Sequence, residues 1–160
     1  MSYITLAAET AVKYYQTRDP FKLLDGIGAK THYRYDLDKK GLKGFAAIIN
    51  HEMFAVINGN LSEHDRRIVA GHEAAHLILH KEQIMQAPAQ ALKDFNLFDS
   101  SGLLEYQANY FLADFLVSDD DVIDSVSDAS RDYFSCAREL CVPPPLLAFK
   151  LHSVMKRRML

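Results

Sequence analysis

The sequence predicts an α+β fold that is mainly helical and contains one small, three-stranded antiparallel sheet. Apolar residues recur at helical spacing before residue 18 and through most of the chain after residue 102. Between these regions, three short runs rich in β-branched and aromatic residues fall within residues 31–59. A chain of 160 residues with 49% hydrophobic and 24% charged residues has the composition of a single globular domain.

Two helices are expected at the N-terminal end. Residues 2–17 place Ile4, Ala8 and Ala11 on one helical face. A shorter helix follows Asp19-Pro20, because Asp is a preferred N-cap and Pro suits the first helical turn.

Three strands are expected next, over residues 31–37, 44–50 and 53–59. His51 and Glu52 separate the second and third runs, which is the spacing of a β-hairpin. We therefore expect the strands to pair antiparallel.

The rest of the chain reads as helix, apart from a polar stretch at 82–100. Ser62 followed by Asp65 resembles a capping box, so a long helix should run from there to about Lys81. Later helices are expected over 103–117, 119–126, 130–140 and 145–158. This divides one domain, 1–160, into N-terminal helices (1–29), a small sheet (30–59), two long helices with their connection (60–128) and a C-terminal helical hairpin (129–160).

The segment His72-Glu73-Ala74-Ala75-His76 lies within the long helix. Residues four apart share a helical face, so both imidazoles can bind one ion, and imidazole nitrogen is a preferred zinc ligand. Glu73 can reach water at that ion and act as the general base. The alternative is that both histidines are satisfied core residues and Glu73 is a surface residue.

Glu105 is the expected third ligand, because it interrupts the apolar helix over 103–117 and a carboxylate there needs a positive partner. His80 is the alternative, although three successive turns of one straight helix rarely converge on one ion. Glu105 could instead only stabilise the positive end of its helix. Asn109 is expected to accept a hydrogen bond from a zinc-binding histidine, and His80 to support the site from outside the ligand set. Tyr106, Tyr110 and His152 are candidates for the donor that stabilises the oxyanion, and the sequence does not choose among them.

The runs AGHEAAHLILH (70–80) and EYQANYFLADFLV (105–117) resemble the ImmA/IrrE family of zinc metallopeptidases. The resemblance implies a zincin-like core and one Zn2+ held by His72, His76 and Glu105. It also implies an endopeptidase that acts on a transcriptional repressor encoded nearby. The segment between the two histidines and the end of the second helix depart from the usual pattern, but neither change touches an expected ligand.

The net charge and the distribution of apolar residues argue against some classes of protein. A net charge of −3 argues against a protein that coats nucleic acid, and no uncharged apolar run is long enough to span a membrane. A cytoplasmic protein is expected, since the N-terminus lacks the pattern of a signal peptide. Two other interpretations stay open: an inactive peptidase fold that acts as a sensor or DNA-associated regulator, and a small-molecule amide hydrolase. The segments 130–140 and 145–158 resemble a helix-turn-helix, but a hairpin of packed helices is expected there, and direct binding of nucleic acid is not.

Overall fold

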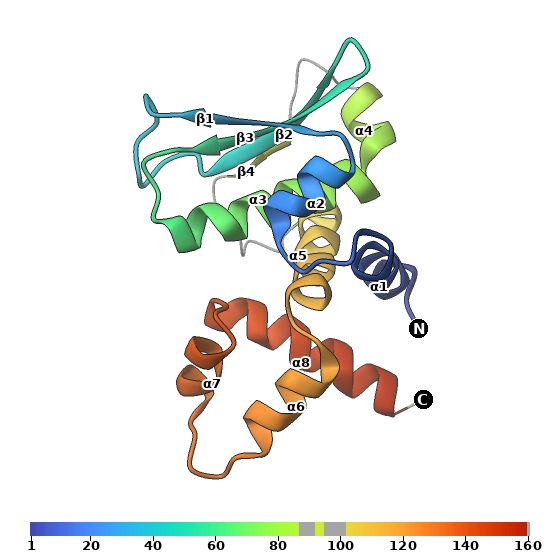
Figure 1. The fold of residues 1–160 in the computed structure, drawn as a ribbon, viewed down its shortest axis with the longest axis vertical. Coiled ribbons are helices and arrows are strands. Elements are labelled where there is room, and N and C mark those ends of the chain that lie inside the picture. The colour runs from blue at the N-terminus through green and yellow to red at the C-terminus, as the bar shows by residue number, and fades with distance from the viewer. Residues whose placement is uncertain (87–91, 95–101, 160) are drawn as a thin grey trace.

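The computed structural model describes residues 1–86, 92–94 and 102–159 (Figure 1). Within these residues the helices are α1 (Tyr3–Tyr15), α2 (Pro20–Gly26), α3 (Glu63–Leu79), α4 (Lys81–Gln86), α5 (Leu103–Leu116), α6 (Asp119–Ser127), α7 (Tyr133–Glu139) and α8 (Pro144–Arg158). The strands are β1 (Lys30–Arg34), β2 (Gly44–Ile49), β3 (Glu52–Asn58) and β4 (Leu92–Asp94). The predicted class, α+β with a small sheet and a majority of helix, is confirmed.

The sheet is mixed, so the prediction that it is antiparallel throughout was wrong. Its strand order is β1-β3-β2-β4, with β2 antiparallel to both β3 and β4, but with β1 parallel to β3. The hairpin of β2 and β3 was predicted correctly. The short fourth strand was not predicted.

The connection between β1 and β2 explains the parallel pair. Residues 35–43 cross the end of β3, so β2 pairs on the far side of β3 instead of beside β1. The Asn58 side chain donates hydrogen bonds to the carbonyls of Asp38 and Leu42, at 2.8 and 3.0 Å, and holds this crossing in place. The alternation of apolar and polar residues along a strand indicates which of its faces is buried. It does not indicate which neighbouring strand it pairs with.

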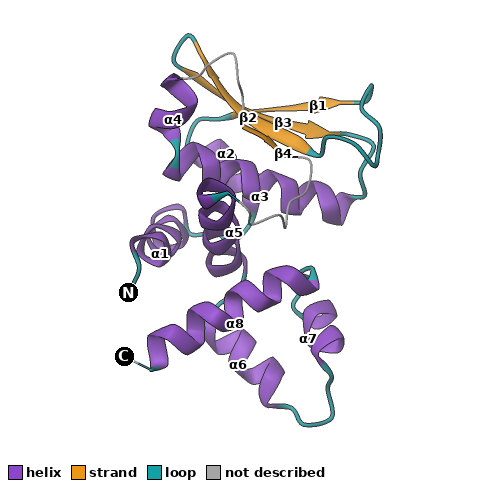
Figure 2. Cartoon of the chain, turned by 180° about the vertical axis from the view of Figure 1, so that it is seen from behind, coloured by secondary structure: helices purple, strands orange, loops and turns teal. Residues whose placement is uncertain are grey.

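The elements form layers, with the sheet at one end of the molecule and α6, α7 and α8 at the other (Figures 1 and 2). One face of the sheet packs on α3, and α3 packs in turn on α2 and α5. Helix α5 also contacts α1 and α8, so it links the sheet end to the C-terminal helices. Its Phe111, Leu112 and Phe115 are fully buried.

Helix α4 is the main element missing from the prediction. It begins just after His80 ends α3, within the stretch expected to be polar and irregular. Only Ile84 of its six residues is buried, so the sequence carries almost no helical period there. The rest of the 82–100 stretch lies outside the described residues, except for the strand β4.

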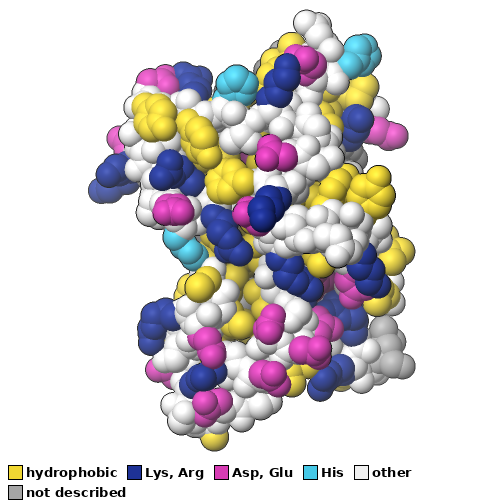
Figure 3. All heavy atoms as spheres, in the orientation of Figure 1, with side chains coloured by type: hydrophobic (Ala, Val, Ile, Leu, Met, Phe, Trp, Pro, Cys, Tyr) yellow, Lys and Arg dark blue, Asp and Glu magenta, His cyan; other side chains and the backbone are white. Residues whose placement is uncertain are grey.

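The surface carries charges of both signs. On the face shown in Figure 3, basic and acidic side chains are interspersed from the sheet end to the C-terminal helices. None of the helices in the described part of the chain combines the length and apolar character needed to cross a bilayer.

Candidate metal centre

Helix α3 holds the His-Glu-x-x-His segment inside the protein core. The helix begins at a cap in which Ser62 Oγ accepts a hydrogen bond from the Asp65 backbone at 3.1 Å. Every residue from Ile68 to Leu77 is buried, because the sheet covers one side of α3 while α2 and α5 cover the others. Both histidines and Glu73 are therefore held in a closely packed environment.

Gly71 allows α5 to come close to this segment. A Cβ atom at residue 71 would lie 2.4 Å from Leu112 Cδ1, which is closer than real contacts allow. With any larger residue there, the end of the buried Leu112 side chain or one of the two helices would have to shift. The close approach brings the first turn of α5, with Glu105, beside the histidines of α3.

Three side chains from the two helices converge on one point. His72 Nε2 lies 3.0 Å from His76 Nε2 and 3.0 Å from Glu105 Oε2, and His76 Nε2 lies 3.2 Å from Glu105 Oε1. Both histidines are fully buried, and the Glu105 side chain is 24% exposed. These three residues are those expected from the sequence, and together they form a possible metal site.

The donor set fits a zinc ion. Four ligands placed tetrahedrally at about 2.0–2.1 Å from zinc lie roughly 3.3 Å from one another, and the observed separations of 3.0–3.2 Å are close to that value. Two imidazoles and one carboxylate match catalytic zinc sites, which leave a fourth position open.

The protonation states also suit a cation. Burial lowers the pKa of His76 to about 4, so this imidazole is neutral near pH 7. Burial by itself would raise the pKa of Glu105, but the contacts with His72 and His76 hold it well below its ordinary range. The site therefore presents a carboxylate beside a neutral imidazole.

Asn109 takes the position expected for it. Its Oδ1 lies 3.0 Å from His72 Nδ1, and both residues are fully buried. An amide oxygen can only accept, so His72 carries its proton on Nδ1 and keeps a lone pair on Nε2. That lone pair faces the cluster.

Glu73 lies next to the histidines, under the start of β2. A Cβ atom at residue 44 would lie 3.3 Å from Glu73 Oε1 and 2.5 Å from Val69 Cγ1, so the glycine lets the strand pass directly against the carboxylate. Glu73 is fully buried on α3, one residue after His72.

The three candidates for an oxyanion donor contact one another. Tyr106, Tyr110 and His152 form a run of ring contacts between α5 and α8, with centroids 5.9 and 6.3 Å apart. Within the described part of the chain, no hydrogen bond connects any of them to the histidine cluster. A role for them stays a prediction.

Gln107 is a polar neighbour of the site that was not predicted from the sequence. Its Oε1 lies 2.9 Å from His80 Nε2, and His80 Nδ1 lies 2.9 Å from His76 Nδ1. Because its side chain leaves a different part of the α5 surface from Glu105, helical spacing carried no signal of this contact.

Comparison with known proteins agrees with the geometry. A curated relative, an uncharacterised immunity region protein of Bacillus phage phi105, is 29% identical over 116 residues, which cover 72% of this chain and 69% of the relative. The model of a peptidase family, described as the IrrE N-terminal-like domain, matches residues 21–152 and so includes both site helices. The chain belongs to this family of peptidases, as the sequence resemblance implied.

Proposed function

We propose that this chain is a zinc-dependent endopeptidase that hydrolyses a peptide bond in a transcriptional repressor. The observation that carries the proposal is the convergence of His72, His76 and Glu105 within 3.2 Å of one another, with the buried Glu73 on the adjoining turn. Three protein ligands leave one coordination position for chemistry, whereas structural zinc sites are closed by four. The zincin-like core that the family resemblance implies is part of this proposal.

Each residue has a separate task. His72, His76 and Glu105 would hold the ion, and Asn109 fixes the ring orientation of His72. A zinc ion bound there would act as a Lewis acid, polarising the peptide carbonyl and lowering the pKa of water. Glu73 would accept a proton from the attacking water and deliver it to the leaving amine.

The substrate class comes from the relative and from the family. The phage relative is named for an immunity region, and the family resemblance implies an enzyme that acts on a repressor encoded nearby. We therefore propose a repressor encoded beside this chain as the substrate, which places the enzyme in the cytoplasm. The mixed surface charge in Figure 3 favours a protein over a nucleic acid as the partner.

The test uses the purified chain loaded with zinc and the product of the neighbouring repressor gene. We expect two defined repressor fragments with the wild-type chain and a loss of about 100-fold or more in rate with Glu73→Gln, at unchanged zinc content. Glu82→Gln makes the same change at an exposed position on α4 and should cleave like wild type. Cleavage that persists in Glu73→Gln would contradict the general-base role. Binding of the repressor without any cleavage by the wild type would favour the non-catalytic module instead.

A further inference from the structure

A chain of three side chains leads away from the candidate metal centre on the side opposite its Nε2 atoms. It runs from His76 Nδ1 to His80 Nδ1 at 2.9 Å, and from His80 Nε2 to Gln107 Oε1 at 2.9 Å. His76 and His80 are 0% and 1% exposed, so bulk water does not compete for the contact between them. His80 belongs to neither the ligand set nor the peptidase chemistry proposed above.

Gln107 fixes the direction of both hydrogen bonds in this series of three side chains. Gln107 Oε1 can only accept, so His80 must donate from Nε2–H. A neutral imidazole carries one N–H, and His80 Nδ1 is then an acceptor. His76 must therefore donate from Nδ1–H, which leaves a lone pair on its Nε2.

The result is the form of His76 that can bind a metal. Its bare Nε2 lies 3.0 Å from His72 Nε2, whose lone pair is fixed in the same way by Asn109. Two lone pairs and a carboxylate then face one another, an arrangement that a bound cation would stabilise.

We propose that Gln107 and His80 form a positioning relay that holds His76 in its Nδ1–H tautomer and so prepares the metal centre. This inference rests on the proposed zinc site, although it does not require that the protein cleave anything. The relay differs from the usual arrangement, in which a carboxylate or a backbone carbonyl accepts directly from a zinc-binding histidine.

The first measurement is zinc affinity, determined by competition with a chelating dye. Gln107→Met keeps the length of the side chain but removes the strong acceptor, and we expect zinc affinity to fall by about 10–100-fold. Gln107→Glu keeps an acceptor and should bind zinc at least as tightly as wild type. Gln83→Met makes the same Gln-to-Met change at an exposed position on α4 and should leave the affinity unchanged.

The second measurement is the tautomer itself, read from the imidazole nitrogen NMR shifts of the metal-free chain. We expect the wild-type proton on Nδ1 of His76 and on Nε2 of His80, and a mixture of tautomers at His76 in Gln107→Met. A proton on His76 Nε2 in the wild type would overturn the relay. So would an unchanged affinity in Gln107→Met.

A further variant tests the middle of the relay. His80→Phe keeps a ring of similar size but removes both nitrogens, so it should weaken zinc binding at least as much as Gln107→Met. Circular dichroism and thermal unfolding verify its fold, and the half-buried Gln107 provides the test if the phenylalanine is not tolerated. Relay-dependent zinc binding without repressor cleavage would refute only the proposed function, whereas cleavage with no effect of Gln107→Met would refute only the relay.

Discussion

Helix α5 carries a polar cluster at each end, and the two clusters differ in how their charges are balanced. Glu105 lies in the first turn of the helix and Asp114 lies near its end. Both residues interrupt an otherwise apolar helix, and both contact side chains far away in the sequence. The comparison shows in which of the two clusters the charge of the carboxylate is balanced by the protein's own side chains.

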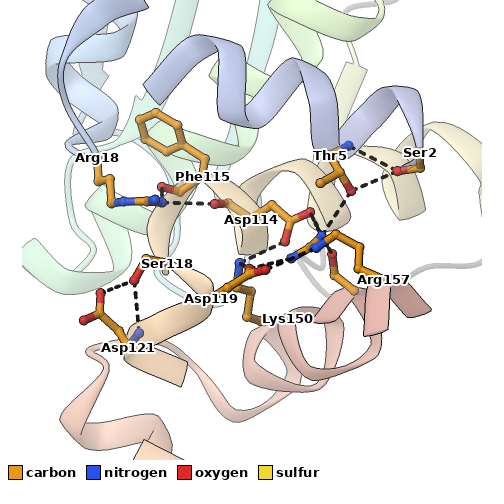
Figure 4. A network of polar contacts seen from close by, with 11 residues as sticks. Ser2, Thr5, Arg18, Asp114, Phe115, Ser118, Asp119, Asp121, Lys150 and Arg157 are labelled. Atoms are coloured by element: carbon orange, nitrogen blue, oxygen red, sulfur yellow. Dashed lines mark hydrogen bonds and ion pairs between the residues drawn. The ribbon is translucent and has the colours of Figure 1, made fainter. Parts of the chain in front are cut away.

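The Asp114 cluster is electrically closed. Asp114 and Asp119 face Lys150 and Arg157, so two carboxylates meet two cations (Figure 4). The Lys150 ammonium lies 3.1 Å from Asp114 and 2.7 Å from Asp119. Arg157 also contacts Thr5, so the cluster connects α1, α5, α6 and α8.

The Glu105 cluster is not closed by charge. Within the described part of the chain, the ion-pair partners of Glu105 are the imidazoles of His72 and His76, and burial keeps His76 neutral near pH 7. Among the described residues, no lysine or arginine pairs with Glu105 in the way that Lys150 and Arg157 pair with Asp114. The Asp114 cluster is balanced by the protein's own side chains, whereas the Glu105 cluster is the possible metal site.

The largest effect on stability is expected at the closed cluster. Asp114→Asn would leave the Lys150 ammonium, which is 3% exposed, without one of its two partners. Breaking a buried pair costs about 3–5 kcal/mol in the free energy of unfolding, measured in urea. Zinc affinity of the folded chain should stay within about threefold of wild type, because Asp114 contacts no expected ligand.

The matched control for this variant is Asp124→Asn, which changes an exposed carboxylate on α6. We expect it to alter the free energy of unfolding by less than about 0.5 kcal/mol. Equal effects of the two substitutions would show that the Asp114 cluster does not stabilise the fold.

Substitutions in the Glu105 cluster should affect metal binding more than stability. Glu105→Gln keeps the shape of the side chain but removes its charge, and we expect zinc affinity to fall at least 100-fold, which is about 2.7 kcal/mol. The metal-free chain should lose less than about 1 kcal/mol, because no buried cation loses its partner. Adding zinc should raise the unfolding temperature of the wild type and not that of the variant. A Glu105→Gln chain that binds zinc normally would remove the basis of the comparison.

The glycine between the two helices should affect both properties. Gly71→Ala places a Cβ 2.4 Å from Leu112 Cδ1, and overpacking of this kind costs about 1–3 kcal/mol. It should also weaken zinc binding about tenfold without touching a ligand, because separating α3 from α5 moves Glu105 away from the histidines. Adding Leu112→Ala should restore part of that affinity.

Gly41→Ala is the control for this glycine, because its Cβ would make ordinary contacts of 3.5 and 3.6 Å. It should leave zinc affinity unchanged. If Gly71→Ala also leaves the affinity unchanged, the spacing of the helices does not control the site.

These residues also show what could be predicted from the sequence. Helical spacing puts His72 and His76 on one face, and a carboxylate near the start of an apolar helix indicates Glu105. Gln107 and the parallel pairing of β1 could not be predicted, since both depend on the way separate elements cross in space. Gly71 lies at one such crossing, but a glycine in a helix does not reveal which side chain opposes it.

The smallest expected effect is the pH dependence of the stability that the Asp114 cluster contributes. Burial would raise the pKa of Asp119, but Lys150 and Arg157 hold it below the ordinary value of 3.8. A lowered folded-state pKa contributes stability above the unfolded value, and that contribution is lost as the pH falls through the folded value. Because 41% of the Asp119 side chain is exposed, Asp119→Asn should cost less than about 1 kcal/mol at pH 7. In urea unfolding the deficit should shrink at about pH 3, where the unfolded carboxyl is largely protonated. A deficit that is the same at both pH values would mean that Asp119 stabilises the fold by packing and not by its charge.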